Sequence, residues 1–106
     1  MLAGVALGAF GAHALKGRLS PEAMQVYQTA VFYHFVHGLA LFVVASSVAQ
    51  DPGGRVRLAG FLFTFGILIF SGSLYTLALT GIRALGALTP IGGLLFLAGW
   101  LLLALT

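Results

Sequence analysis

Charged residues are so sparse in this chain that they divide it into long uncharged stretches. Five Lys and Arg and two Asp and Glu make seven in 106 residues, and 60% of the chain is hydrophobic, whereas a soluble domain carries about 25% charged residues. A helix needs about 20 mostly apolar residues to cross the roughly 30 Å of hydrocarbon in a bilayer. We therefore predict an all-α, integral membrane four-helix bundle. It is a single domain of two helical hairpins, with helices at about residues 1–16, 21–50, 56–80 and 90–105.

Local signals place the ends of these helices. Ser20-Pro21-Glu22 combines an N-cap serine, a proline at the first helical position and an acid in the first turn. Asp51-Pro52-Gly53-Gly54 is typical of a tight turn. Gly81 marks the end of the third helix, and Thr89-Pro90 repeats the cap-plus-proline start for the fourth.

The first apolar stretch, residues 1–15, is short for a span because it reaches only about 22 Å as a helix. Either the helix begins upstream of Met1, or it is shallow and the bilayer thins around it. Gly4, Gly8, Gly11 and Ala12 form a stripe of small residues on this helix. Such a stripe suits close helix packing, either with a second copy or within the chain.

The composition also excludes several kinds of protein. Without cysteine there are no disulfides, thiolate nucleophiles or thiolate metal sites. The basic residues do not form a run or a face, so we expect no nucleic acid partner. The only acids, Glu22 and Asp51, lie at helix ends, which disfavours an exporter driven by an intramembrane acid. The expected partners are membrane lipids, together with a second copy or another membrane protein.

Polar side chains are concentrated in residues 26–38, which hold two of the three histidines and two of the three tyrosines. Antiparallel hairpins place this stretch in the same half of the bilayer as the end of the third helix, while the other half has little beyond Ser46, Ser47 and Thr64. Intramembrane polar groups tend to face the bundle interior or a cavity. We predict one polar cluster or small pocket, rimmed by Lys16, Arg18 and Arg83 and formed by His13, Tyr27, Tyr33, His34, His37, Ser71, Ser73, Tyr75 and Thr76.

Two interpretations of this cluster stay open. The hydroxyls and histidines can hydrogen-bond one another and the backbone as glue between helices, or they can line a ligand pocket. A haem needs axial ligands from facing helices, which His13 and His34 could supply but His34 and His37 on one helix cannot. A metal site of three histidines lacks a nearby carboxylate, and Ser71 or Ser73 lacks a recognisable oxyanion hole. We expect no catalytic residue, metal or cofactor, although a histidine that titrates near neutral pH keeps transport conceivable.

Four motifs carry a resemblance to a known family. These are Gly8-Ala-Phe-Gly-Ala-His-Ala-Leu-Lys16, Tyr33-His34 with His37-Gly38, Phe70-Ser-Gly-Ser-Leu-Tyr75, and Thr89-Pro-Ile-Gly-Gly93. In this order they closely resemble domain-of-unknown-function family 423, whose vertebrate relatives are called transmembrane protein 256. The resemblance implies a four-span protein of the bacterial inner membrane or an organellar membrane, with residues upstream of Met1 and no established activity.

The sequence leaves the orientation open and favours one functional class. Lys16, Arg18 and Arg83 lie on one side, against Arg55 and Arg57 on the other, so the positive-inside count is nearly balanced. We expect a non-enzymatic structural or accessory protein of the bacterial inner membrane. The alternative is a protein that binds a small molecule, a lipid headgroup or an ion, or lets one permeate, through the polar cluster.

Overall fold

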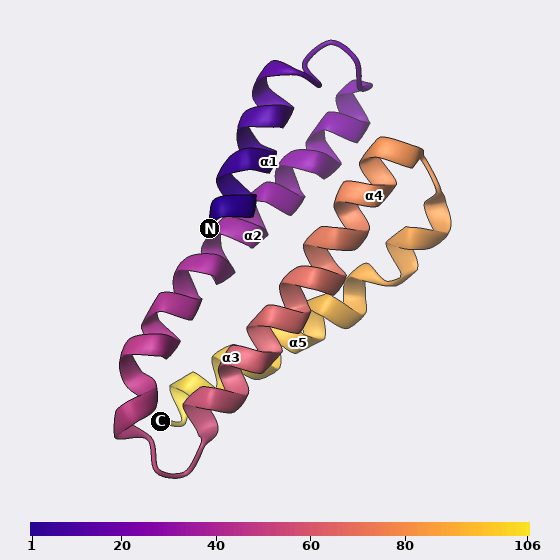
Figure 1. Ribbon diagram of the computed structural model, residues 1–106. Coiled ribbons are helices and arrows are strands. Elements are labelled where there is room, and N and C mark those ends of the chain that lie inside the picture. The colour runs from indigo at the N-terminus through magenta and orange to yellow at the C-terminus, as the bar shows by residue number, and fades with distance from the viewer.

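The computed structural model describes residues 1–106, and all of its regular elements are helices (Figure 1). The five α-helices are α1 (Leu2–His13), α2 (Pro21–Ser47), α3 (Arg55–Gly66), α4 (Gly72–Thr80) and α5 (Thr89–Ala104). Short 3₁₀ turns lie at Val48–Gln50 and Arg83–Ala87, and a π-helical segment, Ile67–Ser71, joins α3 to α4. The all-α prediction is confirmed.

Three helical stretches are long and apolar enough to cross a membrane: Pro21–Gln50, Arg55–Thr80 and Arg83–Ala104. Helix α1 is shorter, because its 12 residues extend only about 18 Å. It ends at His13 rather than near residue 16, and Gly17 then takes a left-handed φ of 82° in the turn. The structure therefore has three helices of spanning length and one shorter apolar helix.

The second helix begins and ends where its sequence signals indicate. The Ser20 hydroxyl accepts a hydrogen bond from the main-chain N–H of Ala23 at 3.1 Å, and Pro21 stands in the first turn. The helix continues through the 3₁₀ turn to Gln50. At the next turn the Asp51 carboxylate accepts a hydrogen bond from the N–H of Val56, which caps the start of α3.

Helices α3 and α4 form one continuous rod from Arg55 to Thr80, here called the α3–α4 rod (Figure 1). The π-helical turn at Ile67–Ser71 takes up more residues than an α-helical turn does. Side chains of α4 are therefore rotated about the rod axis relative to a regular helix continued from α3. The rod ends where Gly81 adopts a left-handed φ of 73°.

The glycine stripe of α1 packs against α2 within the chain. A Cβ atom at position 11 would clash with the Tyr27 ring, and one at position 4 would lie 2.8 Å from the Phe35 ring. Met1 lies against Gly38 in the middle of α2, so α1 covers only the N-terminal half of that helix (Figure 1). Of the two uses that the sequence left open for the stripe, the structure adopts packing within the chain.

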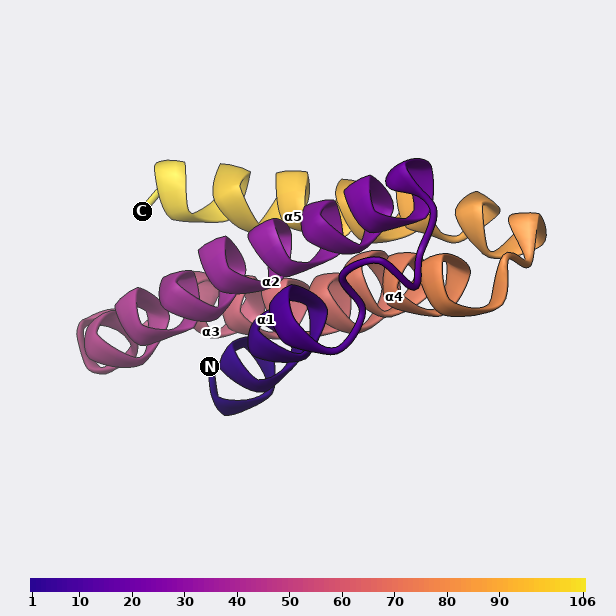
Figure 2. The ribbon, with the colours of Figure 1, turned by 90° about the horizontal axis from the view of Figure 1, so that it is seen from above.

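Helix α5 packs closely against the α3–α4 rod because glycines on both leave room for the ring or the backbone of a facing phenylalanine. The Phe96 ring lies over Gly66, and the Phe70 backbone lies over Gly92. The main hydrophobic core between α2, the rod and α5 consists of Ala40, Val44, Val56, Phe63 and Phe96. Helices α1 and α5 lie on opposite sides of the molecule, α1 against α2 and α5 against the rod (Figure 2).

Candidate functional site

The polar side chains of the predicted cluster separate into two networks on different faces of α2. One joins α1, α2 and α4, and the other joins α2 to α5. The two histidines of α2, His34 and His37, belong to different networks although only three residues separate them. The sequence predicted a single cluster, whereas the structure has these two separate networks.

The first network consists of Tyr27, His34 and Tyr75. The Tyr27 side chain is 1% exposed, and its hydroxyl donates a hydrogen bond to the main-chain carbonyl of Leu7 in α1. Its ring packs edge-on against the Tyr75 ring, with centroids 5.2 Å apart. The Tyr75 hydroxyl lies 3.0 Å from Nδ1 of His34. These contacts connect three helices through groups that would be costly to leave unpaired in a membrane.

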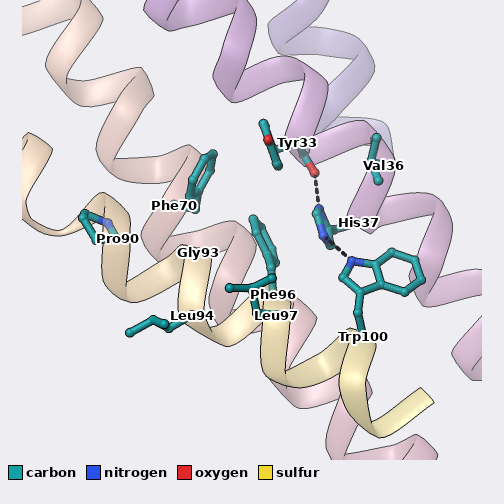
Figure 3. Close-up of a pocket in the computed structure, with 10 residues that line it drawn as sticks. All are labelled: Tyr33, Val36, His37, Phe70, Pro90, Gly93, Leu94, Phe96, Leu97 and Trp100. Carbon is teal, nitrogen blue, oxygen red and sulfur yellow. Dashed lines mark hydrogen bonds between the residues drawn. The ribbon is translucent and has the colours of Figure 1, made fainter. Parts of the chain in front are cut away.

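The second network centres on His37, which is 3% exposed. Its Nδ1 lies 2.8 Å from the main-chain carbonyl oxygen of Tyr33, and its Nε2 lies 2.9 Å from Nε1 of Trp100 (Figure 3). A carbonyl only accepts and an indole N–H only donates. The proton of the neutral ring is therefore on Nδ1, and Nε2 accepts from Trp100. The ring also stacks on Phe96 with centroids 3.5 Å apart.

The serines of α4 and the π-helical segment hold neighbouring helices together. The hydroxyl of Ser71, which is fully buried, donates to the main-chain carbonyl of Ala30 in α2 at 2.8 Å. The Ser73 hydroxyl donates to the Phe70 carbonyl and lies 2.7 Å from the Thr89 hydroxyl at the start of α5. Neither hydroxyl is hydrogen-bonded to a histidine, so the structure contains no serine–histidine dyad at these positions.

The remaining residues of the predicted cluster stand apart from both networks. His13 is the last residue of α1 and is exposed. Thr76 is exposed and donates to the Gly72 carbonyl of its own helix. His13, His34 and His37 do not converge, and no three His, Asp or Glu side chains form a group that could hold a metal.

The basic residues predicted to rim the cluster are all exposed. Lys16 and Arg18 lie in the α1–α2 connection, and Arg83 begins the 3₁₀ turn of the α4–α5 connection. Figure 1 shows these two connections at the same end of the molecule. They mark one end of the bundle, whereas His37 lies near the middle of the spanning stretch Pro21–Gln50.

A groove lies between α2 and α5 beside the π-helical segment, and its volume is about 670 Å³. Tyr33, His37, Phe70, Pro90, Leu94 and Trp100 outline this α2–α5 groove, and Figure 3 labels all ten lining residues. Tyr33 is 37% exposed, and its ring centroid lies 4.7 Å from that of Phe70. The groove surface is almost entirely apolar.

Comparison with known proteins gives the family. The family model described as "Protein of unknown function (DUF423)" matches residues 7–93. The chain belongs to the DUF423 family. A UPF0382 membrane protein of Staphylococcus haemolyticus is 52% identical over 102 residues, which cover 96% of this chain and 83% of that protein. The UPF0382 membrane protein YwdK of Bacillus subtilis is 48% identical over 103 residues, covering 96% of this chain and 84% of the relative. No solved structure matches.

The resemblance stated from the motifs is confirmed, and this DUF423 protein has the composition and helices of a membrane protein. Its relatives in Staphylococcus and Bacillus are named as membrane proteins, which supports a bacterial membrane location. The matched region, residues 7–93, contains both histidines of the two networks, while Trp100 lies beyond it.

Sequence reasoning missed the part that Trp100 plays in this DUF423 protein. The half of the bilayer away from the predicted cluster was expected to be poor in polar groups, although Trp100 supplies an N–H there. It is the only tryptophan of the chain and lies well inside α5. An indole N–H at membrane depth needs an acceptor within the protein, and His37, near the middle of α2, is at a matching depth. Matching the depths of the two residues would have paired His37 with Trp100.

Proposed function

We propose that this protein is a non-enzymatic structural or accessory component of the bacterial inner membrane. One observation carries the proposal: no buried side-chain nitrogen or oxygen lacks a hydrogen-bond partner within the chain. The groups best suited to chemistry, His34, His37 and Ser71, each form a hydrogen bond that joins two helices. Such a pattern is typical of glue between membrane helices.

The same groups are poorly disposed for catalysis. Both ring nitrogens of His37 are engaged, so its Nε2 could act as a base only after the bond to Trp100 is broken. The Ser71 hydroxyl is fully buried and bonded to α2, out of reach of a substrate. A nucleophile needs a base within hydrogen-bond reach and a site for the reacting atom. Neither Ser71 nor Ser73 has such a base, because neither is hydrogen-bonded to a histidine.

We further propose that α1 is inserted in the membrane, so that the protein is a bundle of four membrane helices. The support is that α1 is apolar and packs through its glycines against the spanning helix α2. The Tyr27 hydroxyl of α2 donates a hydrogen bond to the Leu7 carbonyl of α1, and the Tyr27 side chain lies among apolar side chains. A helix resting on the membrane surface would instead carry a charged face, and α1 has no Asp, Glu, Lys or Arg.

Cysteine labelling provides a direct test of this topology, because the natural chain contains no cysteine. Single cysteines are introduced at Arg18, Gln50, Arg83 and Thr106, and right-side-out and inverted membrane vesicles are treated with a membrane-impermeant maleimide. We expect positions 18 and 83 to react from one side and positions 50 and 106 from the other, because the three long helices alternate in direction.

A cysteine at Leu2 then tests α1. We expect it to be protected in both kinds of vesicle and to react only after the membrane is dissolved, because Leu2 lies at the level of the middle of α2. Labelling of Leu2→Cys from the same side as Arg18→Cys, at a similar rate, would place α1 at the surface and contradict the four-helix bundle.

The structural role of the first network is tested through His34 and Tyr75. We expect His34→Leu and Tyr75→Phe each to lower the free energy of unfolding in detergent. Their effects should be coupled by about 0.5–1.5 kcal/mol, the usual size of a polar pair between membrane helices. Unfolding is followed by circular dichroism during titration with dodecyl sulfate.

The matched control for this cycle is Thr76→Val. Thr76 is exposed and bonds only to its own helix, so its removal should change the free energy of unfolding by less than about 0.5 kcal/mol. Full stability of both His34→Leu and Tyr75→Phe would contradict the structural proposal, since the pair would then be free for another role.

A further inference from the structure

The α2–α5 groove lies where only lipid-soluble compounds can reach it. His37, on its wall, is near the middle of the spanning stretch Pro21–Gln50. The groove opens along the side of the bundle between two spanning helices, as Figure 3 shows. We propose that this groove binds a neutral, flat-ringed, lipid-soluble compound whose ring carries a carbonyl group, which is the chemistry of a membrane quinone. This inference goes beyond the proposed structural role.

The absence of charge on the groove walls points to a neutral ligand. None of the ten lining residues is Asp, Glu, Lys or Arg. The only imidazole among them, His37, is held neutral by its two hydrogen bonds. A charged ligand taken from water into such a site would lose its hydration without gaining a partner, so a fatty acid or a phosphate headgroup does not fit.

The aromatic side chains of the groove favour a flat ring over a flexible acyl chain. The planes of Tyr33, His37 and Phe96 are parallel to within 11°, the angle between Tyr33 and Phe96. Phe70 adds a tilted ring, with its centroid 5.4 Å from that of Phe96. Aromatic rings gain energy beyond area burial when they stack or meet edge to face, and a saturated chain gains none of this directional energy.

One polar group in the groove has no partner in the protein. The hydroxyls of Tyr27 and Tyr75 are both hydrogen-bonded, whereas Tyr33 contributes only its main-chain carbonyl, to His37. The Tyr33 side chain lines the groove and is partly exposed. An O–H group in hydrocarbon gains by donating a hydrogen bond, and a carbonyl oxygen on a bound ring would accept it.

The groove also has the size that such a ligand requires. Its volume of about 670 Å³ lies within the roughly 300–1,000 Å³ of typical small-molecule sites. Gly93 has no side chain to fill the groove beside Phe70, and a Cβ atom there would come no closer than 3.9 Å to the Phe70 ring. The groove volume is large enough for a two-ring head, and a lipid-like tail can leave through the open side.

The test uses Trp100, the single tryptophan, as a built-in reporter on the groove wall. The whole chain is reconstituted in phosphatidylcholine vesicles and titrated with menadione, a naphthoquinone, while tryptophan fluorescence is recorded. We expect quenching that saturates. Tyr33→Phe should raise the apparent Kd about tenfold, the effect of one lost hydrogen bond, and Gly93→Leu should abolish the saturable component by filling the groove.

Gly72→Leu is the matched control, because a side chain at Gly72 meets nothing within 4 Å and lies outside the α2–α5 groove. It should bind menadione like the unmodified chain. Circular dichroism and unfolding in detergent confirm that each variant keeps its fold, so a failed structural role is recognised separately from lost binding. Linear quenching that is equal in all variants would overturn the proposal. Saturable quenching that Tyr33→Phe leaves unchanged would overturn the assignment of a carbonyl ligand.

Discussion

Replacing Gly92 by alanine should destabilise the protein by about 2–3 kcal/mol, although alanine is the better helix former. A Cβ atom at this position would lie 2.5 Å from the main-chain nitrogen of Phe70 and 2.8 Å from its Cα atom. Because these atoms belong to the backbone of the rod, no change of side-chain rotamer can relieve the contact. Helix α5 must move away from the rod, which also loosens Phe96 over Gly66.

The neighbouring glycine provides the control for this measurement. A Cβ atom at Gly93 meets only the Phe70 ring, at 3.9 Å, an ordinary contact distance. Gly93→Ala should therefore leave stability unchanged or raise it by up to about 1 kcal/mol through helix propensity. Both variants are compared by unfolding in detergent. Equal stability of Gly92→Ala and Gly93→Ala would show that α5 does not approach the rod as closely as described.

Replacement of His37 by leucine should have a similarly large effect, a loss of about 2–4 kcal/mol. The substitution removes the ring that stacks on Phe96, and it leaves the Trp100 indole N–H without its acceptor. It also frees the Tyr33 carbonyl of its second hydrogen bond. Unfolding in detergent gives the energy, and a changed emission of Trp100 reports the altered surroundings of the indole.

The variant Trp100→Phe separates the contribution of the Trp100–His37 hydrogen bond from that of the His37–Phe96 stack. The phenylalanine keeps an aromatic ring beside Phe63 but donates nothing to His37. We expect a loss of about 1 kcal/mol, the usual net value of one hydrogen bond. If His37→Leu proves no more costly than Trp100→Phe, the stack on Phe96 contributes little and the network is weaker than its geometry indicates.

The fold was predictable from sequence wherever a helix end depends on local chemistry. Ser20 and Pro21 start α2 through capping and a preset φ, and these effects act over only a few residues. Gly81 ends the rod because it takes a left-handed φ. The lack of charge between such signals then determines which stretches can lie in a membrane. The boundaries of α2 and of the rod could accordingly be placed to within a residue or so.

The partners of the polar groups could not be predicted in the same way, because they depend on how each helix is rotated. His34 and His37 are close in sequence and at similar depth, yet His34 faces Tyr75 of α4 while His37 faces Trp100 of α5. The π-helical turn adds to this difficulty, since a periodic pattern drawn through Ile67–Ser71 misplaces the faces beyond it. Ser73 and Thr76 were both expected in the polar cluster, but Ser73 is buried and Thr76 is exposed.

The order of helices across the bundle has a consequence for how the molecule is made. Each helix packs against the helix synthesised immediately before it: α2 packs against α1, the α3–α4 rod against α2, and α5 against the α3–α4 rod. Contacts between sequence neighbours form quickly and need no long loop to close. We expect the chain to assemble hairpin by hairpin as it leaves the ribosome, with the His37–Trp100 bond closing last, when α5 has joined the earlier helices.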